Sequence, residues 1–235
     1  MIMFSLLFAA SAAITPVPQT TDAANWWQQR FVAKQQLVKA GGAPLVFLGD
    51  SITHFFEEPG RGLAVWQRHF APRHALNLGF SADRTEHLLW RITQGGELDG
   101  YSAKAIVLMI GTNNAGHRGL DKESAADTID GVRKVLAAIR QRQPKAITVL
   151  CAVFPRGEKA DDPFRGRHAV VNRALKQFAD GKQVIWVDFN DRFLLPNGDI
   201  DKSLMPDFLH PSEAGYEIWA SAILPLIDSA TTTQR

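Results

Sequence analysis

The feature that most constrains the fold of this chain is the alternation of short apolar runs with longer amphipathic segments. Each run is almost continuously apolar, which is typical of parallel strands covered on both faces. The predicted strands are 45–48, 75–78, 105–110, 147–153 and 184–187, and the predicted helices are 25–40, 84–93, 122–142, 164–179 and 212–227. Because parallel strands need crossover helices, the pattern predicts a doubly wound α/β sandwich around a parallel sheet.

Composition narrows the classes of protein that such a chain can belong to. Among 235 residues there is a single cysteine, Cys151, so neither an internal disulfide nor a Cys-rich zinc site is available. Hydrophobic residues make up 46% of the chain, enough for one core in a single domain over 25–230. The net charge is only +2 and no basic run occurs, so we do not expect a nucleic-acid partner.

The first residues have the character of an export signal. From Ile2 to Ala13 the chain is almost wholly apolar and ends in small-x-small patterns at 10–12 and 11–13, which a signal peptidase could cut. We predict a signal peptide over 1–13, a linker over 14–24 and a periplasmic or secreted protein. The stretch is too short for stable membrane insertion. Since no Lys or Arg precedes Arg30, a cytoplasmic protein with a loosely packed tail is the alternative.

Small and polar residues follow three predicted strands, at the edge where open α/β sheets bind their ligands. Gly-Asp-Ser occupies 49–51, Gly-Phe-Ser-Ala-Asp occupies 79–83, and Gly-Thr-Asn-Asn occupies 111–114. A fourth segment, Asp-Phe-Leu-His at 207–210, precedes the last predicted helix. Together these segments bring a hydroxyl, an imidazole, a carboxylate and an amide to one edge of the sheet.

These groups can perform nucleophilic catalysis. Ser51 lies at a strand-to-helix turn, where helix N–H groups favour developing negative charge. His210 can take the serine proton, and Asp207 can orient the imidazole. The N–H groups of Ser51 and Gly79 and the amide of Asn113 are candidate oxyanion donors. This chemistry needs no metal and no cofactor.

Each of these segments alone has a plainer structural explanation. Gly-Asp-Ser is a common turn, Asn113 fits a turn or helix cap, and 207–210 fits a surface loop. Their occurrence at successive strand ends favours a site. We expect Asp50 to hydrogen-bond the turn backbone, Arg84 to form an ion pair at a helix start, and His87 to lie at the surface.

In this order, the four segments resemble the four sequence blocks of the SGNH, or GDSL-type, hydrolases. The run 77–91 and the Gly-Thr-Asn-Asn segment are most similar to the platelet-activating-factor acetylhydrolase branch, which also has Asn at the position of Asn114. The resemblance implies a flavodoxin-like three-layer α/β/α sandwich with a five-stranded parallel sheet, and ester hydrolysis through an acyl-enzyme. It also implies the same roles: Ser51 as nucleophile, His210 as base, Asp207 as orienting acid, and Ser51, Gly79 and Asn113 as oxyanion donors.

The substrate is left open by the sequence. The leading interpretation is a serine esterase that removes a short acyl group, acetyl above all, from a small-molecule or carbohydrate ester. A lipase, thioesterase or lysophospholipase of the same fold is the alternative, followed by a non-catalytic module that holds a ligand in the same cleft. Related subunits dimerise, so the resemblance also leaves a homodimer open.

Overall fold

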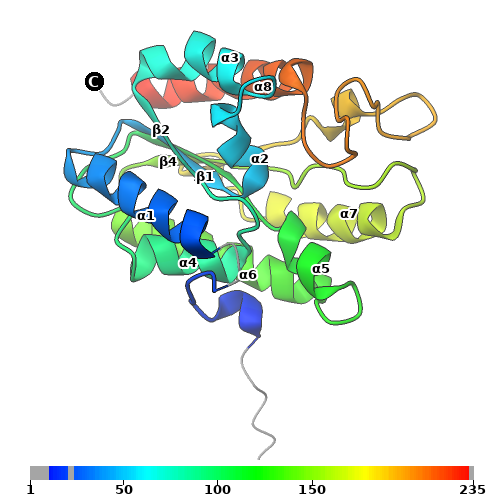
Figure 1. The fold of residues 1–235 in the computed structure, drawn as a ribbon, viewed down its shortest axis with the longest axis horizontal. Coiled ribbons are helices and arrows are strands. Elements are labelled where there is room, and N and C mark those ends of the chain that lie inside the picture. The colour runs from blue at the N-terminus through cyan, green and yellow to red at the C-terminus, as the bar shows by residue number, and fades with distance from the viewer. Residues whose placement is uncertain (1–10, 21–23, 233–235) are drawn as a thin grey trace, which may run out of the picture.

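A computed structural model describes residues 11–20 and 24–232 and shows a three-layer α/β/α sandwich (Figure 1). All neighbouring strands are parallel, and their order in the sheet is β2-β1-β3-β4-β5. The strands are β1 Leu45–Gly49, β2 Ala75–Gly79, β3 Ala105–Met109, β4 Ile147–Cys151 and β5 Val184–Val187. This is the flavodoxin-like order, and each predicted strand is confirmed to within two residues at its ends.

The sheet is covered by helices on both faces. The longer helices are α1 Ala24–Lys39, α4 Thr85–Thr93, α5 Thr112–Arg118, α6 Ala125–Arg142, α7 Pro163–Lys176 and α8 Glu213–Thr232. Figure 1 shows α1, α4, α6 and α7 on one side of the sheet and α8 on the other. Alternate residues of β1 enter separate cores: Val46 packs with α4 and α6, whereas Phe47 packs with α8. Burial on both faces explains why the strand is apolar throughout.

The connection from β1 to β2, for which no helix range was predicted from the sequence, is a series of short helical segments. They are α2 Ser51–His54, η2 Phe55–Glu57, α3 Leu63–Val65, η3 Trp66–Phe70 and η4 Ala71–Arg73. Their aromatic rings pack on the sheet, with ring centroids of Phe47 and Phe70 at 4.7 Å and of Phe56 and Trp219 at 4.9 Å. Long-range aromatic packing therefore determines the path of this connection. Its apolar residues do not follow a helical spacing from which the segments could be predicted.

The chain before α1 also packs on the domain. Residues 11–20 include η1, Ala12–Ile14, which contacts α4 and α6, and Ala13 has no exposed surface. The first ten residues of the predicted signal peptide, and 21–23 of the predicted linker, lie outside the described residues. Within the described residues, no helix combines the length and the apolar character needed to cross a bilayer.

Candidate active site

Ser51 is the first residue of α2, immediately after the carboxyl end of β1. Asp50 caps this helix, because its Oδ1 accepts a hydrogen bond from the Ile52 N–H at 3.0 Å. The structure thus confirms the expectation that Asp50 binds the turn backbone. The Ser51 N–H belongs to the first helical turn, where backbone donors have no partner within the helix. It therefore remains available to a ligand.

Two glycines allow α2 to lie directly against the strand ends. A Cβ at Gly49 would lie 2.2 Å from Thr53 Oγ1, and a Cβ at Gly79 would lie 2.3 Å from the backbone nitrogen of His54. Asn77 of β2 stabilises the contact between β2 and α2, since its Nδ2 donates to Thr53 O at 3.0 Å. The position of Ser51 therefore depends on the close approach of α2 to the ends of β1 and β2, which requires glycine at 49 and 79.

The prediction that the Gly79 N–H is an oxyanion donor needs correction. This N–H already donates to Asn77 Oδ1 at 2.8 Å, so Gly79 holds α2 in place instead. The following loop contains Ala82 in the left-handed region, with φ of 65°, and closes through a hydrogen bond from Asp83 N to Phe80 O at 3.1 Å. Within the described part of the chain, neither the Ser81 N–H nor the Ala82 N–H has an acceptor. The Ala82 N–H could not be predicted as a donor from the sequence, because alanine rarely adopts a positive φ.

Ser51, His210 and Asp207 form one continuous chain of hydrogen bonds. Ser51 Oγ lies 2.9 Å from His210 Nε2, and His210 Nδ1 lies 2.8 Å from Asp207 Oδ2. Because a carboxylate only accepts, Nδ1 carries the proton and Nε2 presents a lone pair to the serine hydroxyl. Burial lowers the pKa of His210 below its ordinary value, against the opposing effect of Asp207. The imidazole is accordingly neutral at pH 7 and can take a proton.

The loop that carries the imidazole is held by the same carboxylate. Asp207 Oδ1 accepts hydrogen bonds from the N–H of His210 at 2.7 Å and of Leu209 at 3.2 Å. Burial alone would raise the pKa of Asp207, but the hydrogen bonds from His210 outweigh burial and lower it. Asp207 is therefore ionised at neutral pH and fixes both the backbone and the ring of His210.

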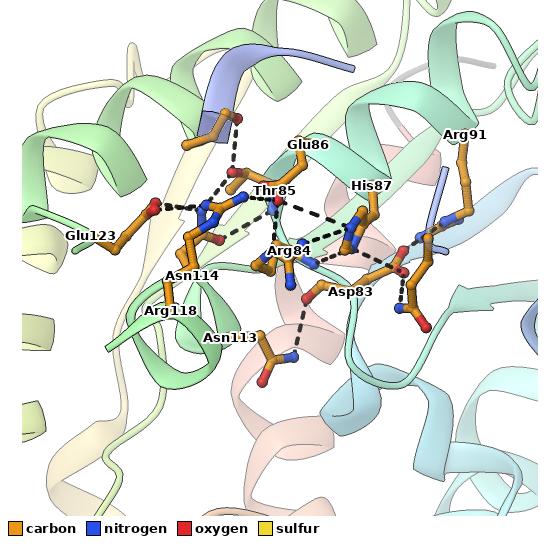
Figure 2. Close-up of polar contacts among 12 residues, drawn as sticks. Asp83, Arg84, Thr85, Glu86, His87, Arg91, Asn113, Asn114, Arg118 and Glu123 are labelled. Carbon is orange, nitrogen blue, oxygen red and sulfur yellow. Dashed lines mark hydrogen bonds and ion pairs between the residues drawn. The ribbon is translucent and has the colours of Figure 1, made fainter. Parts of the chain in front are cut away.

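Asn113 and Asn114 extend from the carboxyl end of β3 toward the loop after β2 (Figure 2). Asn113 Nδ2 donates one hydrogen to Asp83 O at 3.0 Å, which leaves its second hydrogen free. Asn114 Oδ1 accepts from the Thr85 N–H at 3.1 Å, and its Nδ2 donates to Thr85 Oγ1 and to Glu123 Oε1, each at 2.9 Å. The two asparagines have different roles, because Asn113 keeps a free donor and Asn114 is a structural link.

A buried ionic network that was not predicted from the sequence supports this loop. Asp83 has no exposed surface and accepts hydrogen bonds from Trp27 Nε1 and Arg91 Nε, both at 2.8 Å. The ion pair expected at the start of α4 is confirmed, with Arg84 Nε 2.6 Å from Glu86 Oε1. The prediction of a surface His87 is wrong: its ring is buried and caps α4 by accepting from the Arg84 N–H at 3.1 Å. Burial lowers the pKa of His87 to about 3.

A serine, an imidazole and a carboxylate aligned at the carboxyl edge of a doubly wound sheet form the arrangement found in serine hydrolases. Residues 47–218 match the GDSL-like Lipase/Acylhydrolase family, and the chain belongs to this family. It is a carboxylic ester hydrolase.

Individual relatives agree with this assignment. The chain is 32% identical to human platelet-activating factor acetylhydrolase IB subunit alpha1 over 205 residues, which cover 86% of this chain and 82% of the relative. It shares its fold with a GDSL-like lipase from Bacteroides thetaiotaomicron, with a TM-score of 0.66, 18% identity and coverage of 85% and 99% of the two chains. It also resembles Axe2, an acetylxylan esterase from Geobacillus stearothermophilus, with a TM-score of 0.58, 24% identity and coverage of 80% and 94%.

Proposed function

We propose that this protein is a serine esterase that removes short acyl groups, above all acetyl, from oxygen esters through an acyl-enzyme. The observation that carries the proposal is the continuous contact from Ser51 Oγ through His210 to Asp207, at 2.9 and 2.8 Å. A nucleophile needs a base within hydrogen-bond distance and a third group that orients the base, and each is present.

In the proposed reaction, Ser51 Oγ attacks the ester carbonyl while His210 Nε2 takes the hydroxyl proton. The tetrahedral intermediate collapses as His210 returns this proton to the leaving alcohol, and the acyl group stays on Ser51. A water molecule then gives a proton to His210 and attacks the acyl carbonyl. The carboxylic acid leaves and the proton returns to Ser51 Oγ. Asp207 remains ionised throughout and stabilises the imidazolium.

Three donors are proposed for the oxyanion: the Ser51 N–H, the Ala82 N–H and the second amide hydrogen of Asn113. Each is without an acceptor among the described residues, and Asn113 is bonded to the carbonyl of Asp83, the residue next to Ala82. The donors come from three different strand ends, so the sheet fixes their relative positions before substrate binds. Such preorganised donors stabilise charge that develops only in the transition state.

The acetyl preference is proposed from two kinds of relative. One is an acetylhydrolase at 32% identity, and another that shares the fold is an acetylxylan esterase. Ser51 is only 6% exposed and Asn113 only 4%, which is consistent with a confined acyl site. With the predicted export signal, these relatives favour acetylated carbohydrate outside the cytoplasm as substrate. A homodimer, known among related subunits, is likewise a proposal.

Hydrolysis of p-nitrophenyl acetate, butyrate and octanoate by the purified protein tests this function. We expect turnover to fall steeply beyond acetate and to disappear in Ser51→Ala. Ser221→Ala is the matched control, because Ser221 is exposed on α8 and its Oγ bonds only to surface partners, accepting from Arg192 Nη1 at 3.1 Å and donating to Ile218 O at 2.8 Å. A preference for octanoate would replace the acetylesterase by a longer-chain hydrolase. Ester turnover that survives in Ser51→Ala would remove Ser51 as nucleophile, and no turnover at all would favour a ligand-binding module.

A further inference from the structure

Residues 11–20 run across α4 and α6 beside the loop that connects β2 to α4, and are called the N-terminal strap below. We infer that the N-terminal strap positions Asn113 in the oxyanion site, an inference that rests on the proposed function. The hydrogen bonds of the strap described below go to Ser81, Asp83 and Thr85 rather than to Ser51 or His210. Its residues are therefore positioning residues, which act through the β2–α4 loop.

The first attachment of the strap is Gln19, whose side chain is 4% exposed. Gln19 Nε2 donates to Ser81 O at 3.3 Å and to Asp83 Oδ1 at 3.1 Å. One amide thus binds the loop at its backbone and at the carboxylate that Arg91 also holds. Asp83 in turn accepts the Asn113 amide through its carbonyl oxygen. Only Asp83 separates the strap from a proposed oxyanion donor.

The second attachment is the carbonyl oxygen of Ala13, which accepts the Thr85 hydroxyl at 2.9 Å. Ala13 is fully buried, and a Cβ at Gly131 of α6 would lie 2.9 Å from its carbonyl oxygen and 2.3 Å from Thr85 Oγ1. Because α6 approaches so closely at Gly131, the strap cannot shift at Ala13 without a clash. Thr85 also binds Asn114 through both its N–H and its hydroxyl, as Figure 2 shows.

The two attachments fix the loop between the strap on one side and the asparagines on the other. Asn113 uses one amide hydrogen on Asp83 O, and because the amide is planar, this bond sets the direction of the second hydrogen. If the loop relaxes, the free hydrogen turns away from the position of the oxyanion. Such a change weakens the transition state and leaves ground-state binding almost unchanged, so it lowers kcat rather than raising KM.

The test compares two buried glutamines that differ in their place in the fold. Gln19→Leu removes the strap amide. Gln143→Leu removes an equally buried amide that bonds Ala103 N, Leu98 O and Tyr101 O, near the amino end of β3 and away from the site. With p-nitrophenyl acetate, we expect Gln19→Leu to lower kcat by about tenfold with KM within about twofold. Gln143→Leu should lose thermal stability with kcat within about twofold of the unaltered protein.

Three further variants keep the inference open to refutation. In an Asn113→Ala background the effect of Gln19→Leu should shrink to less than about twofold, because the residue it positions is absent. Thr85→Val, which removes the second attachment, should lower kcat, and Thr85→Ser, which keeps the hydroxyl, should restore it. The pH midpoint of kcat/KM should not move in any of these proteins, since His210 is untouched.

The outcomes separate this inference from the proposed function. If Ser51→Ala is inactive and Asn113→Ala is slow, but Gln19→Leu and Thr85→Val have the kcat of the control, the strap is structural only and the inference is overturned. An equal loss of kcat in Gln19→Leu and Gln143→Leu would also overturn it. If Ser51→Ala retains turnover, the proposed function itself fails.

Discussion

The substitution Gly79→Ala adds one methyl group at the point where β2 touches α2. The new Cβ would lie 2.3 Å from His54 N and 2.6 Å from the carbonyl carbon of Thr53, although ordinary van der Waals contact begins at 3.4 Å. The obstructing atoms belong to backbone and cannot rotate away, so α2 has to move by about 1 Å. We expect the free energy of unfolding to fall by about 1–3 kcal/mol, the usual cost of overpacking.

The same movement should also lower the rate of hydrolysis. Alanine keeps the backbone N–H that Gly79 donates to Asn77, so no hydrogen bond is removed directly. Ser51 moves with α2, however, and its Oγ leaves the 2.9 Å contact with His210 Nε2. A displacement of about 1 Å can cost about 10²-fold in rate, so we expect kcat on p-nitrophenyl acetate to fall by about that factor.

Urea unfolding and steady-state hydrolysis measure the two effects in Gly79→Ala. The control is Gly166→Ala in the interior of α7, where an added Cβ meets no atom within 4 Å and φ is not positive. This control should be more stable than the unaltered protein by about 0.5–1 kcal/mol and have the same kcat. Unaltered stability and kcat in Gly79→Ala would refute the reasoning that a backbone contact positions the nucleophile.

Three other outcomes follow from the site and its surroundings. Asn113→Ala should lower kcat for p-nitrophenyl acetate by about 10²–10³-fold with little change in KM, and near-normal turnover would remove Asn113 from the mechanism. In the proposed mechanism neutral His210 is the base, and burial lowers its pKa, so a pH series of kcat/KM should rise from acid with a midpoint below 6.5; a midpoint above 7 would contradict this assignment. Burial lowers the pKa of His168 to about 4, so the unfolded chain takes up this proton first and stability falls as pH drops below 6.5. Urea unfolding at pH 7 and pH 5 should show His168→Asn losing about 2 kcal/mol less than the unaltered protein, and equal losses would contradict the role of His168.

The sheet could be predicted from sequence because its strands are buried on both faces. Val46 and Phe47 enter opposite cores, so no polar residue interrupts the run and the whole of β1 is visible as one apolar segment. The connection after β1 could not be predicted in this way. Phe56 packs against the rings of Tyr216 and Trp219, which are far away in the sequence, and Phe70 packs against Phe47 of β1. The local spacing of residues does not indicate these partners.

The part of the candidate site that consists of reactive side chains could be predicted from the sequence, because those residue types are visible in it. Ser51 opens the helix after β1, Asp207 and His210 lie in the loop before α8, and the structure joins the three through hydrogen bonds. Unlike the Ser51 N–H, the backbone donor from the loop after β2 was not predictable, because hydrogen-bond partners decide which N–H is free. Gly79 is a glycine for reasons of packing, and the loop N–H groups without an acceptor in the described chain belong to Ser81 and Ala82. The positive φ of Ala82 is not evident from the sequence.

The N-terminal strap also bears on the proposed export of this protein. The small-x-small patterns allow cleavage after Ala12 or after Ala13, and only the first cut leaves the carbonyl oxygen that Thr85 binds. If the strap positions the loop, active protein secreted from a bacterial host should begin at Ala13 or earlier, as mass spectrometry of its intact mass would show. Active protein beginning at Ile14 would show that the Ala13 contact is dispensable, and protein retained in the cytoplasm with Met1 intact would refute export. On this proposal, the hydrogen bond between Ala13 O and Thr85 restricts where a leader can be cut, because Ala13 ends the small-x-small pattern and is also a buried part of the domain.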